Sequence, residues 1–146
     1  MTDSTSDGLL PTFSVSAELA QLALGVARGT ARALDIAVCI AIADAAGNLV
    51  AFERMNDAPL MSAQLAQDKA YSVCAFRGLP TDQWWSVLES EGALLHGIVK
   101  TDRLIVFGGG VPVRVDGRLV GAVGVSGGSA EQDRAVADAG AKAVGG

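Results

Sequence analysis

Two side chains are the first candidates for proton transfer. His96 is the only histidine in the chain, and an imidazole titrates close to neutral pH. Lys69 lies among Leu65, Ala66 and Val73, so it is a charged residue on an otherwise apolar helix face. Such a lysine either extends its ammonium group to solvent or lies in a pocket where burial lowers its pKa. The sequence leaves both interpretations open.

The sequence does not indicate a metal site built from several side chains. There is no second histidine, and no cysteine or acidic residue stands at the spacing of a zinc or non-haem iron site. A haem iron needs only one axial side chain. On chemistry alone, the candidates for that role are His96, Tyr71, Met55, Met61, Cys39 and Cys74. A lone histidine is more often structural than a ligand, and this remains the alternative for His96.

Two glycine-rich segments, the first at residues 108–110 and the second at residues 126–128, form another group of candidates. Ser129 followed by Gln132 is a capping box, so the second segment comes directly before a predicted helix N-terminus. Free backbone N–H groups at such a terminus suit an anionic ligand. The candidate binding residues are Gly108, Gly109, Gly110, Ser126, Gly127 and Gly128. Neither segment matches a P-loop or a dinucleotide fingerprint, and turn geometry explains the glycines equally well.

Arg54 closes a predicted hairpin and is a further candidate for anion binding. Its guanidinium group is a planar fork that matches a carboxylate or a phosphate. Adjacent strand residues point to opposite faces, so Glu53 and Arg54 do not readily share one cleft. An exposed arginine in an ion pair is an equally good interpretation.

The elements that must position these residues follow from the hydrophobic pattern. Apolar spacing predicts helices over residues 16–34, 61–76 and 130–144, and a short helix over 82–88. Ser16 is the expected N-cap of the first helix. Apolar runs predict a hairpin of strands over 37–43 and 49–54, followed by three strands between 104 and 126, with Asp116-Gly117 at a two-residue turn. Residues 90–103 have no clear assignment. This order favours an α+β fold with one mostly antiparallel five-stranded sheet and helices packed on it.

Composition and charge limit the classes of partner. A 146-residue chain that is 50% hydrophobic is long enough for one domain with a core, here residues 14–146 after a flexible tail at 1–13. Its formal charge of −5 and the absence of a basic run disfavour nucleic acid and membrane surfaces. The high apolar share suggests that a partner subunit covers part of the surface. With no secretory signal and two isolated cysteines, a cytoplasmic homo-oligomer with free thiols is expected.

Five segments in order resemble one protein family. They are Asp44-Ala-Ala-Gly-Asn-Leu-Val-Ala, Arg54-Met-Asn-Asp-Ala, Ser62 through Asp68-Lys-Ala70, Phe107-Gly-Gly-Gly-Val-Pro-Val, and Val120-Gly-Ala-Val-Gly-Val-Ser-Gly-Gly with Gln132-Asp133. The chain resembles the GlcG/HbpS family of haem-binding or "haem-degrading" domains, which also occurs at the C-terminus of PduO-type proteins. The resemblance covers about residues 14–140.

The resemblance implies a fold, an assembly and a ligand. The implied fold is a profilin-like α+β sandwich with a five-stranded antiparallel sheet, and the implied assembly is a dimer or a larger ring such as an octamer. Haem is the implied cofactor. The shared motifs carry Arg54, Lys69, the two glycine segments and Asp133, whereas no motif assigns an iron ligand to His96.

Two functions follow as hypotheses. The first is a small-ligand-binding protein that binds haem, with His96 near the iron and the propionates at Arg54 or at the Ser126–Gly128 helix start. The alternative is a cofactor-free isomerase, tautomerase or hydrolase. Its substrate would be a small carboxylate from aromatic or organic-acid catabolism, bound by Arg54, with Lys69, His96 or Asp133 moving protons.

Overall fold

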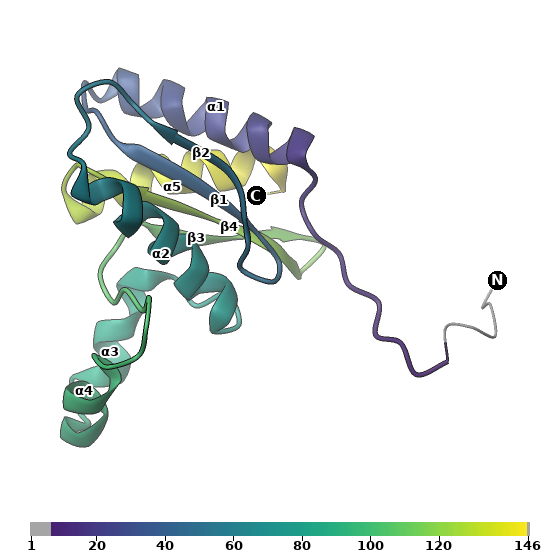
Figure 1. Cartoon of the computed structure of the whole chain (residues 1–146), viewed down its shortest axis with the longest axis vertical. Helices are drawn as coiled ribbons and strands as arrows, with labels where there is room; N and C mark the ends of the chain where they lie inside the picture. The colour runs from purple at the N-terminus through teal and green to yellow at the C-terminus, as the bar shows by residue number, and fades with distance from the viewer. Residues whose placement is uncertain (1–6, 146) are drawn as a thin grey trace.

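The computed structural model describes residues 7–145. Its centre is a four-stranded antiparallel sheet in the order β2-β1-β4-β3. The strands are β1 (Cys39–Asp44), β2 (Leu49–Arg54), β3 (Gly110–Val115) and β4 (Arg118–Ser126). Helices α1 (Ala17–Ala33) and α5 (Ala130–Val144) cover one face, and α2 (Met61–Ala75) covers the other (Figure 1). The α+β class is therefore confirmed.

Local signals for the long helices and the turn are confirmed. The Ser16 side chain accepts a hydrogen bond from the Leu19 amide at the start of α1. Ser129 and Gln132 form both halves of a capping box at the start of α5. At the β3–β4 turn, Asp116 and Gly117 have φ of 51° and 78°, as a type I′ turn requires.

The prediction of a fifth strand is wrong. The apolar run 104–107 is not a strand; it leads from α4 to the start of β3 as an irregular segment. Its backbone is held by a side chain instead of a neighbouring strand: the Ser72 hydroxyl accepts a hydrogen bond from the Ile105 amide and donates one to the Arg103 carbonyl. Gly109, with φ of 128°, then turns the chain into β3.

The sheet separates two apolar clusters of different side-chain size. Ile40 and Ile42 of β1 face α1 and α5 in the larger cluster. Cys39, Ala41 and Ala43 point the other way, into a cluster of small side chains beneath α2. Since alternate strand residues point to opposite faces, one strand supplies both. The small residues let α2 lie close to β4.

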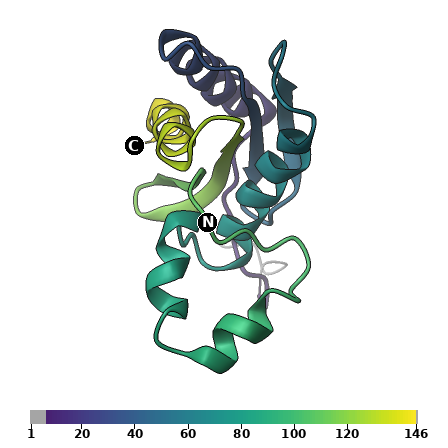
Figure 2. The same ribbon diagram turned by 90° about the vertical axis from the view of Figure 1, so that its left-hand side faces the viewer.

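A third part of the molecule projects from the sheet. The short helices α3 (Trp84–Leu88) and α4 (Gly92–Ile98) follow a 3-10 turn at Thr81–Gln83, and we call residues 81–103 the arm. Figures 1 and 2 show the arm extending below α2, away from α1 and α5. Helix α4 falls in the segment that the sequence pattern left unassigned.

The N-terminal region is joined to the sheet at Val15. Residues 7–14 contain no helix or strand, and the remainder of the predicted flexible tail, residues 1–6, lies outside the described residues. The Val15 amide donates a hydrogen bond to the Val120 carbonyl, which ties the chain to the sheet. None of the described helices is both long and apolar enough to cross a bilayer.

Candidate functional site

Lys69 and Asp133 form a buried ion pair at one end of the sheet. The Lys69 ammonium group donates to Oδ2 of Asp133 at 3.2 Å and to the carbonyl of Val125 at 2.8 Å. The two side chains are only 1% and 4% exposed. Lys69 comes from α2, Val125 from β4 and Asp133 from the first turn of α5, so the pair joins both faces of the sheet.

The third direction around the ammonium group is closed by an aromatic ring. The Lys69 nitrogen lies 5.1 Å from the centroid of the Phe107 ring, within the range of a cation–π contact. Burial lowers the pKa of Lys69, and the nearby Asp133 carboxylate partly opposes that shift. Lys69 is therefore buried with a lowered pKa, and it does not extend its ammonium group to solvent. The nitrogen is enclosed by the protein's own groups.

The glycine segments fit closely around this pair. A side chain at Gly109 would place its Cβ 2.6 Å from the Lys69 nitrogen, and one at Gly110 would lie 2.7 Å from the Lys69 carbonyl oxygen. At Gly108 the neighbour would be the Ala130 carbonyl oxygen at 3.2 Å. These glycines thus allow the start of β3 to approach α2 and α5, and their role toward a ligand stays a prediction.

The start of α5 is capped from within the chain. Oδ1 of Asp133 accepts a hydrogen bond from the Gly128 amide at 2.8 Å, and the Gln132 side chain accepts one from the Ser129 amide. Gly127 has φ of 136°, and Ser126 is buried beside it. Since the Gly128 and Ser129 amides already have acceptors, an anion there must compete with Asp133.

Arg54 lies at the same end of the sheet. Arg54 and Ser126 both pair with Cys39, so two strand spacings of about 4.8 Å each separate their backbones. The Arg54 guanidinium donates to the Ala58 carbonyl at 3.3 Å and opens onto a cavity of about 500 Å³. The cavity is lined by Arg28, Arg32, Glu53, Arg54, Met55 and Asn56.

Two arginines of this cavity were not singled out in the sequence. Arg28 forms an ion pair with Glu53 at 2.8 Å, and both side chains are 31% exposed. Glu53 and Arg54 both line this cavity, so the expectation that these neighbouring strand residues do not readily share one cleft is wrong. Arg28 and Arg32 are four residues apart on α1, so they share one helix face. This four-residue spacing, in a helix expected to pack on the sheet, is the sequence signal from which the two arginines could have been identified.

The structure separates the candidates for an iron ligand. Cys39 is fully buried, and Cys74 is hydrogen-bonded to the Asp44 carbonyl; burial, followed by the charge of Asp44, raises the pKa of the Cys74 thiol to about 12. Tyr71 is half-buried, with the Arg103 guanidinium 4.1 Å from its ring centroid, and Met55 packs against the core. Only His96 and Met61 of this set are exposed.

His96 is placed apart from the other candidates. It is an exposed residue of α4, in the arm, whereas Lys69 and Asp133 are buried between α2 and α5, and the Lys69 nitrogen lies 5.1 Å from the Phe107 ring centroid. The structure therefore brings together Lys69, Asp133 and the two glycine segments, and leaves His96 in a different part of the molecule. Within residues 7–145, no group of three or more histidine, cysteine or acidic side chains could hold a metal ion.

With this geometry established, comparison with known proteins identifies the family. Residues 15–142 match the family model described as "Haem degrading protein HbpS-like". This chain belongs to the HbpS-like family. An uncharacterised 15.0 kDa protein from the dhaT-dhaS intergenic region of Citrobacter freundii is 36% identical over 132 residues, covering 84% of this chain and 92% of the relative.

Solved structures of relatives agree with the fold of this HbpS-like chain. The Klebsiella pneumoniae protein ORFY has 28% sequence identity and a TM-score of 0.88, with 94% of each chain covered. A crystal structure described as a PduOC–haem complex has 31% identity and a TM-score of 0.79, covering 90% of this chain and 95% of the other. The full-length corrinoid adenosyltransferase PduO of Salmonella typhimurium is much longer, and this chain spans 34% of it.

Proposed function

We propose that this protein binds haem on the exposed surface of the arm, with His96 as the axial ligand to iron. The observation that carries the proposal is the position of His96: it is the chain's only imidazole, and it faces solvent on α4. The haem complex of a relative with 31% identity supports the choice of ligand. When bound, haem would supply an iron centre for ligand or electron exchange.

The helix surface around His96 suits a flat, partly apolar group. Gly92 and Ala93 lie one turn before His96 in α4, and Val99 and Lys100 follow directly after the end of the helix. Gly92 and Ala93 leave room beside the imidazole, and Val99 is 70% exposed, so it offers apolar contact. Lys100 is exposed and carries the charge that a propionate would pair with.

A surface site also agrees with the sizes of the cavities. The cavities described for this chain are about 250 to 500 Å³, in or below the lower half of the range of about 300–1,000 Å³ for sites that enclose a drug-sized ligand, whereas a porphyrin with two propionates is at the large end of that class. The cavity of about 500 Å³ is lined by charged groups, which do not suit a porphyrin face. The residues that fit haem are therefore on the open arm, where a second subunit could cover its other face.

The first prediction is that His96→Ala abolishes the Soret shift that haemin shows on binding the wild-type protein. The reason is the loss of the imidazole–iron bond, while the exposed position leaves the fold intact. An absorbance titration with haemin measures it, and Met61→Ala is the matched control because Met61 is the other exposed candidate. An unchanged spectrum in His96→Ala, or loss of the shift only in Met61→Ala, would remove His96 from this role.

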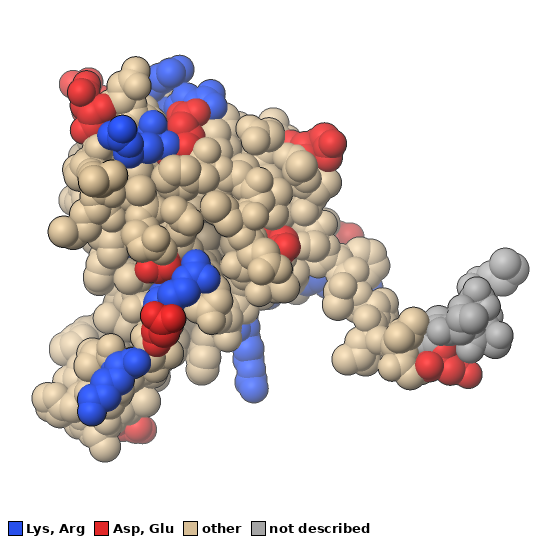
Figure 3. Space-filling view, viewed as in Figure 1, with Lys and Arg blue, Asp and Glu red and all other residues tan. Residues whose placement is uncertain are grey.

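Self-association forms part of the same proposal, as a dimer or larger ring. Leu19, Leu22 and Val26 form an exposed apolar stripe along α1, with exposed fractions of 41%, 49% and 37%. The glycine at position 29 continues the stripe, and a Cβ there would meet no atom within 4 Å. In the view of Figure 3 the charged side chains form small separate groups with uncharged surface between them. Free cysteines are compatible with a reducing cytoplasm.

The second prediction is that Leu22→Glu reduces the mass of the assembly. A carboxylate in the middle of the α1 stripe must lose water on association, while the isolated subunit keeps it in solvent. Light scattering after size exclusion measures the mass. Val87→Glu, which places the same charge on the exposed side of α3, is the control expected to keep the wild-type mass; equal masses for all three proteins would contradict a role for α1.

A second candidate function rests on the arginine cavity. Three guanidinium groups, of Arg28, Arg32 and Arg54, line one polar cavity, and arginine forks bind carboxylates in two-point contacts. We propose that this cavity takes a small carboxylate. Catalysis by Lys69 and Asp133 on such a ligand would need access to an ion pair that is 1% and 4% exposed, so the structure favours binding over turnover.

The third prediction is that Arg54→Leu weakens the binding of benzoate, used as the probe, by roughly tenfold or more. A hydrogen bond to a charged group contributes about 1.5–3 kcal/mol, and each 1.4 kcal/mol is about tenfold in affinity. Calorimetric titration measures the affinity. Arg118→Leu, at the opposite end of β4, is the control, and equal affinity in both variants would make Arg54 an ordinary surface residue.

A further inference from the structure

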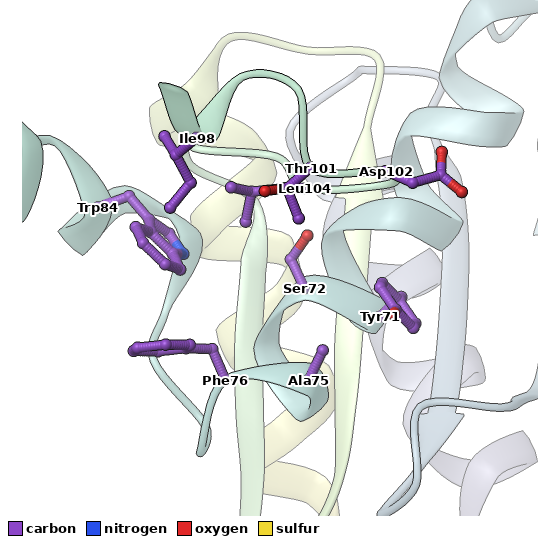
Figure 4. Close-up of a pocket in the computed structure, with 9 residues that line it drawn as sticks. All are labelled: Tyr71, Ser72, Ala75, Phe76, Trp84, Ile98, Thr101, Asp102 and Leu104. Carbon is purple, nitrogen blue, oxygen red and sulfur yellow. The ribbon is translucent and has the colours of Figure 1, made fainter. Parts of the chain in front are cut away.

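A cavity of about 370 Å³ lies between α2 and the arm, and it is separate from both sites proposed above. Figure 4 shows the residues that line it. Its walls are mainly apolar or aromatic: Tyr71, Ala75, Phe76, Trp84, Ile98 and Leu104. The rings of Phe76 and Trp84 are tilted by 52° to one another, with centroids 4.9 Å apart, so they form one aromatic corner.

One polar group in this wall has no partner. Trp84 is 3% exposed, and its Nε1 is the only buried side-chain nitrogen or oxygen among the described residues without a hydrogen bond. Figure 4 shows this nitrogen on the edge of the indole that faces the space toward Ser72 and Leu104. Buried donors without a partner are rare in folded proteins and indicate a missing water, ion or ligand.

We propose that this cavity binds a small, flat, uncharged molecule that accepts a hydrogen bond from Nε1 of Trp84. The aromatic corner supplies stacking and edge contacts for a single ring. The indole N–H can donate but cannot accept, so the ligand must carry an acceptor such as a carbonyl oxygen or a ring nitrogen. The proposal does not depend on haem binding.

The other polar groups of the cavity specify charge and orientation. The Ser72 hydroxyl is already used by the Ile105 amide and the Arg103 carbonyl, which leaves Trp84 as the inner donor. On the solvent side, the exposed Asp102 is followed by Arg103, whose guanidinium lies 4.1 Å from the ring centroid of Tyr71, so the two opposite charges there favour neither an anion nor a cation. An uncharged ligand therefore enters with its acceptor first and its apolar edge against Ile98 and Leu104.

Entry of the ligand requires a small movement of the arm. Less than 1 Å² of Nε1 is accessible, so an acceptor reaches it only when the indole shifts outward. Helix α3 is five residues long, and Trp85, next in the chain, is 56% exposed. A short helix with one buried and one exposed tryptophan can turn more easily than α2, which contacts all four strands.

Acetophenone and ethylbenzene form a matched pair of probes, since they have nearly the same shape but only acetophenone has a carbonyl acceptor. The test follows the two indole N–H signals in ¹H–¹⁵N spectra, with Trp85→Phe assigning them. Acetophenone should shift the Trp84 signal in a saturable way and bind roughly tenfold more tightly than ethylbenzene, as one hydrogen bond gives. Judged by the Trp84 signal alone, benzoate should bind this cavity more weakly than acetophenone, whatever its affinity for the arginine cavity.

Two variants make the result specific to the cavity. Ala75→Phe fills the space from an exposed position at the end of α2, and it should abolish the Trp84 shift. Ala93→Phe adds the same ring on the exposed side of α4 and should leave the shift unchanged. The proposal is overturned if acetophenone moves both indole signals equally, if ethylbenzene binds as well, or if Ala75→Phe binds acetophenone like the wild type.

Discussion

Replacing Lys69 with methionine is expected to lower the free energy of unfolding by about 3–5 kcal/mol, which is the usual cost of removing one partner of a buried ion pair. The Asp133 carboxylate would remain 4% exposed without its cation, and the Val125 carbonyl would lose a hydrogen bond. Since 1 kcal/mol corresponds to about 2–4 °C in a domain of this size, the melting temperature should fall by roughly 10 °C. Urea unfolding measures the free energy.

The double variant Lys69→Met/Asp133→Asn is the matched control. In the wild type the Gly128 amide donates a hydrogen bond to Oδ1 of Asp133. Asparagine keeps an oxygen for that bond and removes the negative charge that Lys69→Met leaves unpaired. We expect the double variant to be more stable than Lys69→Met alone. A loss of less than about 1 kcal/mol in the free energy of unfolding of Lys69→Met would contradict this expectation. It would also be contradicted if the double variant lost the sum of what Lys69→Met and Asp133→Asn lose separately, because the two residues would then not act as a unit.

Gly124→Ala is expected to destabilise the fold by about 1–3 kcal/mol or more, as overpacking of a close contact does. A Cβ at this position would overlap the Ala66 carbonyl oxygen and lie 2.7 Å from the Ala70 amide nitrogen. Both are backbone atoms of α2, so the whole helix must move away from β4. Such a movement would also disturb Lys69, which lies between them in α2.

Gly29→Ala is the control for that substitution. Gly29 lies in α1, and a Cβ there would meet no atom within 4 Å, so the change should stabilise the helix by up to about 1 kcal/mol. Thermal and urea unfolding of both variants give the comparison. A Gly124→Ala protein as stable as the wild type would mean that α2 does not pack on β4 at this distance.

Local sequence signals were sufficient for most of the fold. The caps at Ser16 and Ser129 and the turn at Asp116-Gly117 are decided by side chains and φ preferences within a few residues, and all three are confirmed. The run at 104–107 has the composition of a strand, yet the hydroxyl of Ser72, far away in the chain, takes its backbone hydrogen bond instead. A contact of that kind leaves no local pattern.

The candidate site was harder to derive for the same reason. Lys69 could be identified as unusual among apolar neighbours, but its burial and its pairing with Asp133 depend on the packing of α2 against α5 across β4. The glycines at 108–110 are explained by that packing once it is known. The Trp84 cavity combines residues from α2, the arm and the segment after it. The sequence shows only that Trp84 and Trp85 are adjacent, and it does not show which distant residues pack around Trp84.

Mapping the iron on the protein surface tests whether haem binds on the arm through His96. Haemin carries a paramagnetic iron, while gallium protoporphyrin has nearly the same shape without unpaired electrons. We expect haemin, but not the gallium compound, to broaden the backbone amide signals of residues 92–100 first, and His96→Ala to remove this pattern. Broadening centred on Met61, or spread over the α1 stripe without preference for the arm, would contradict it.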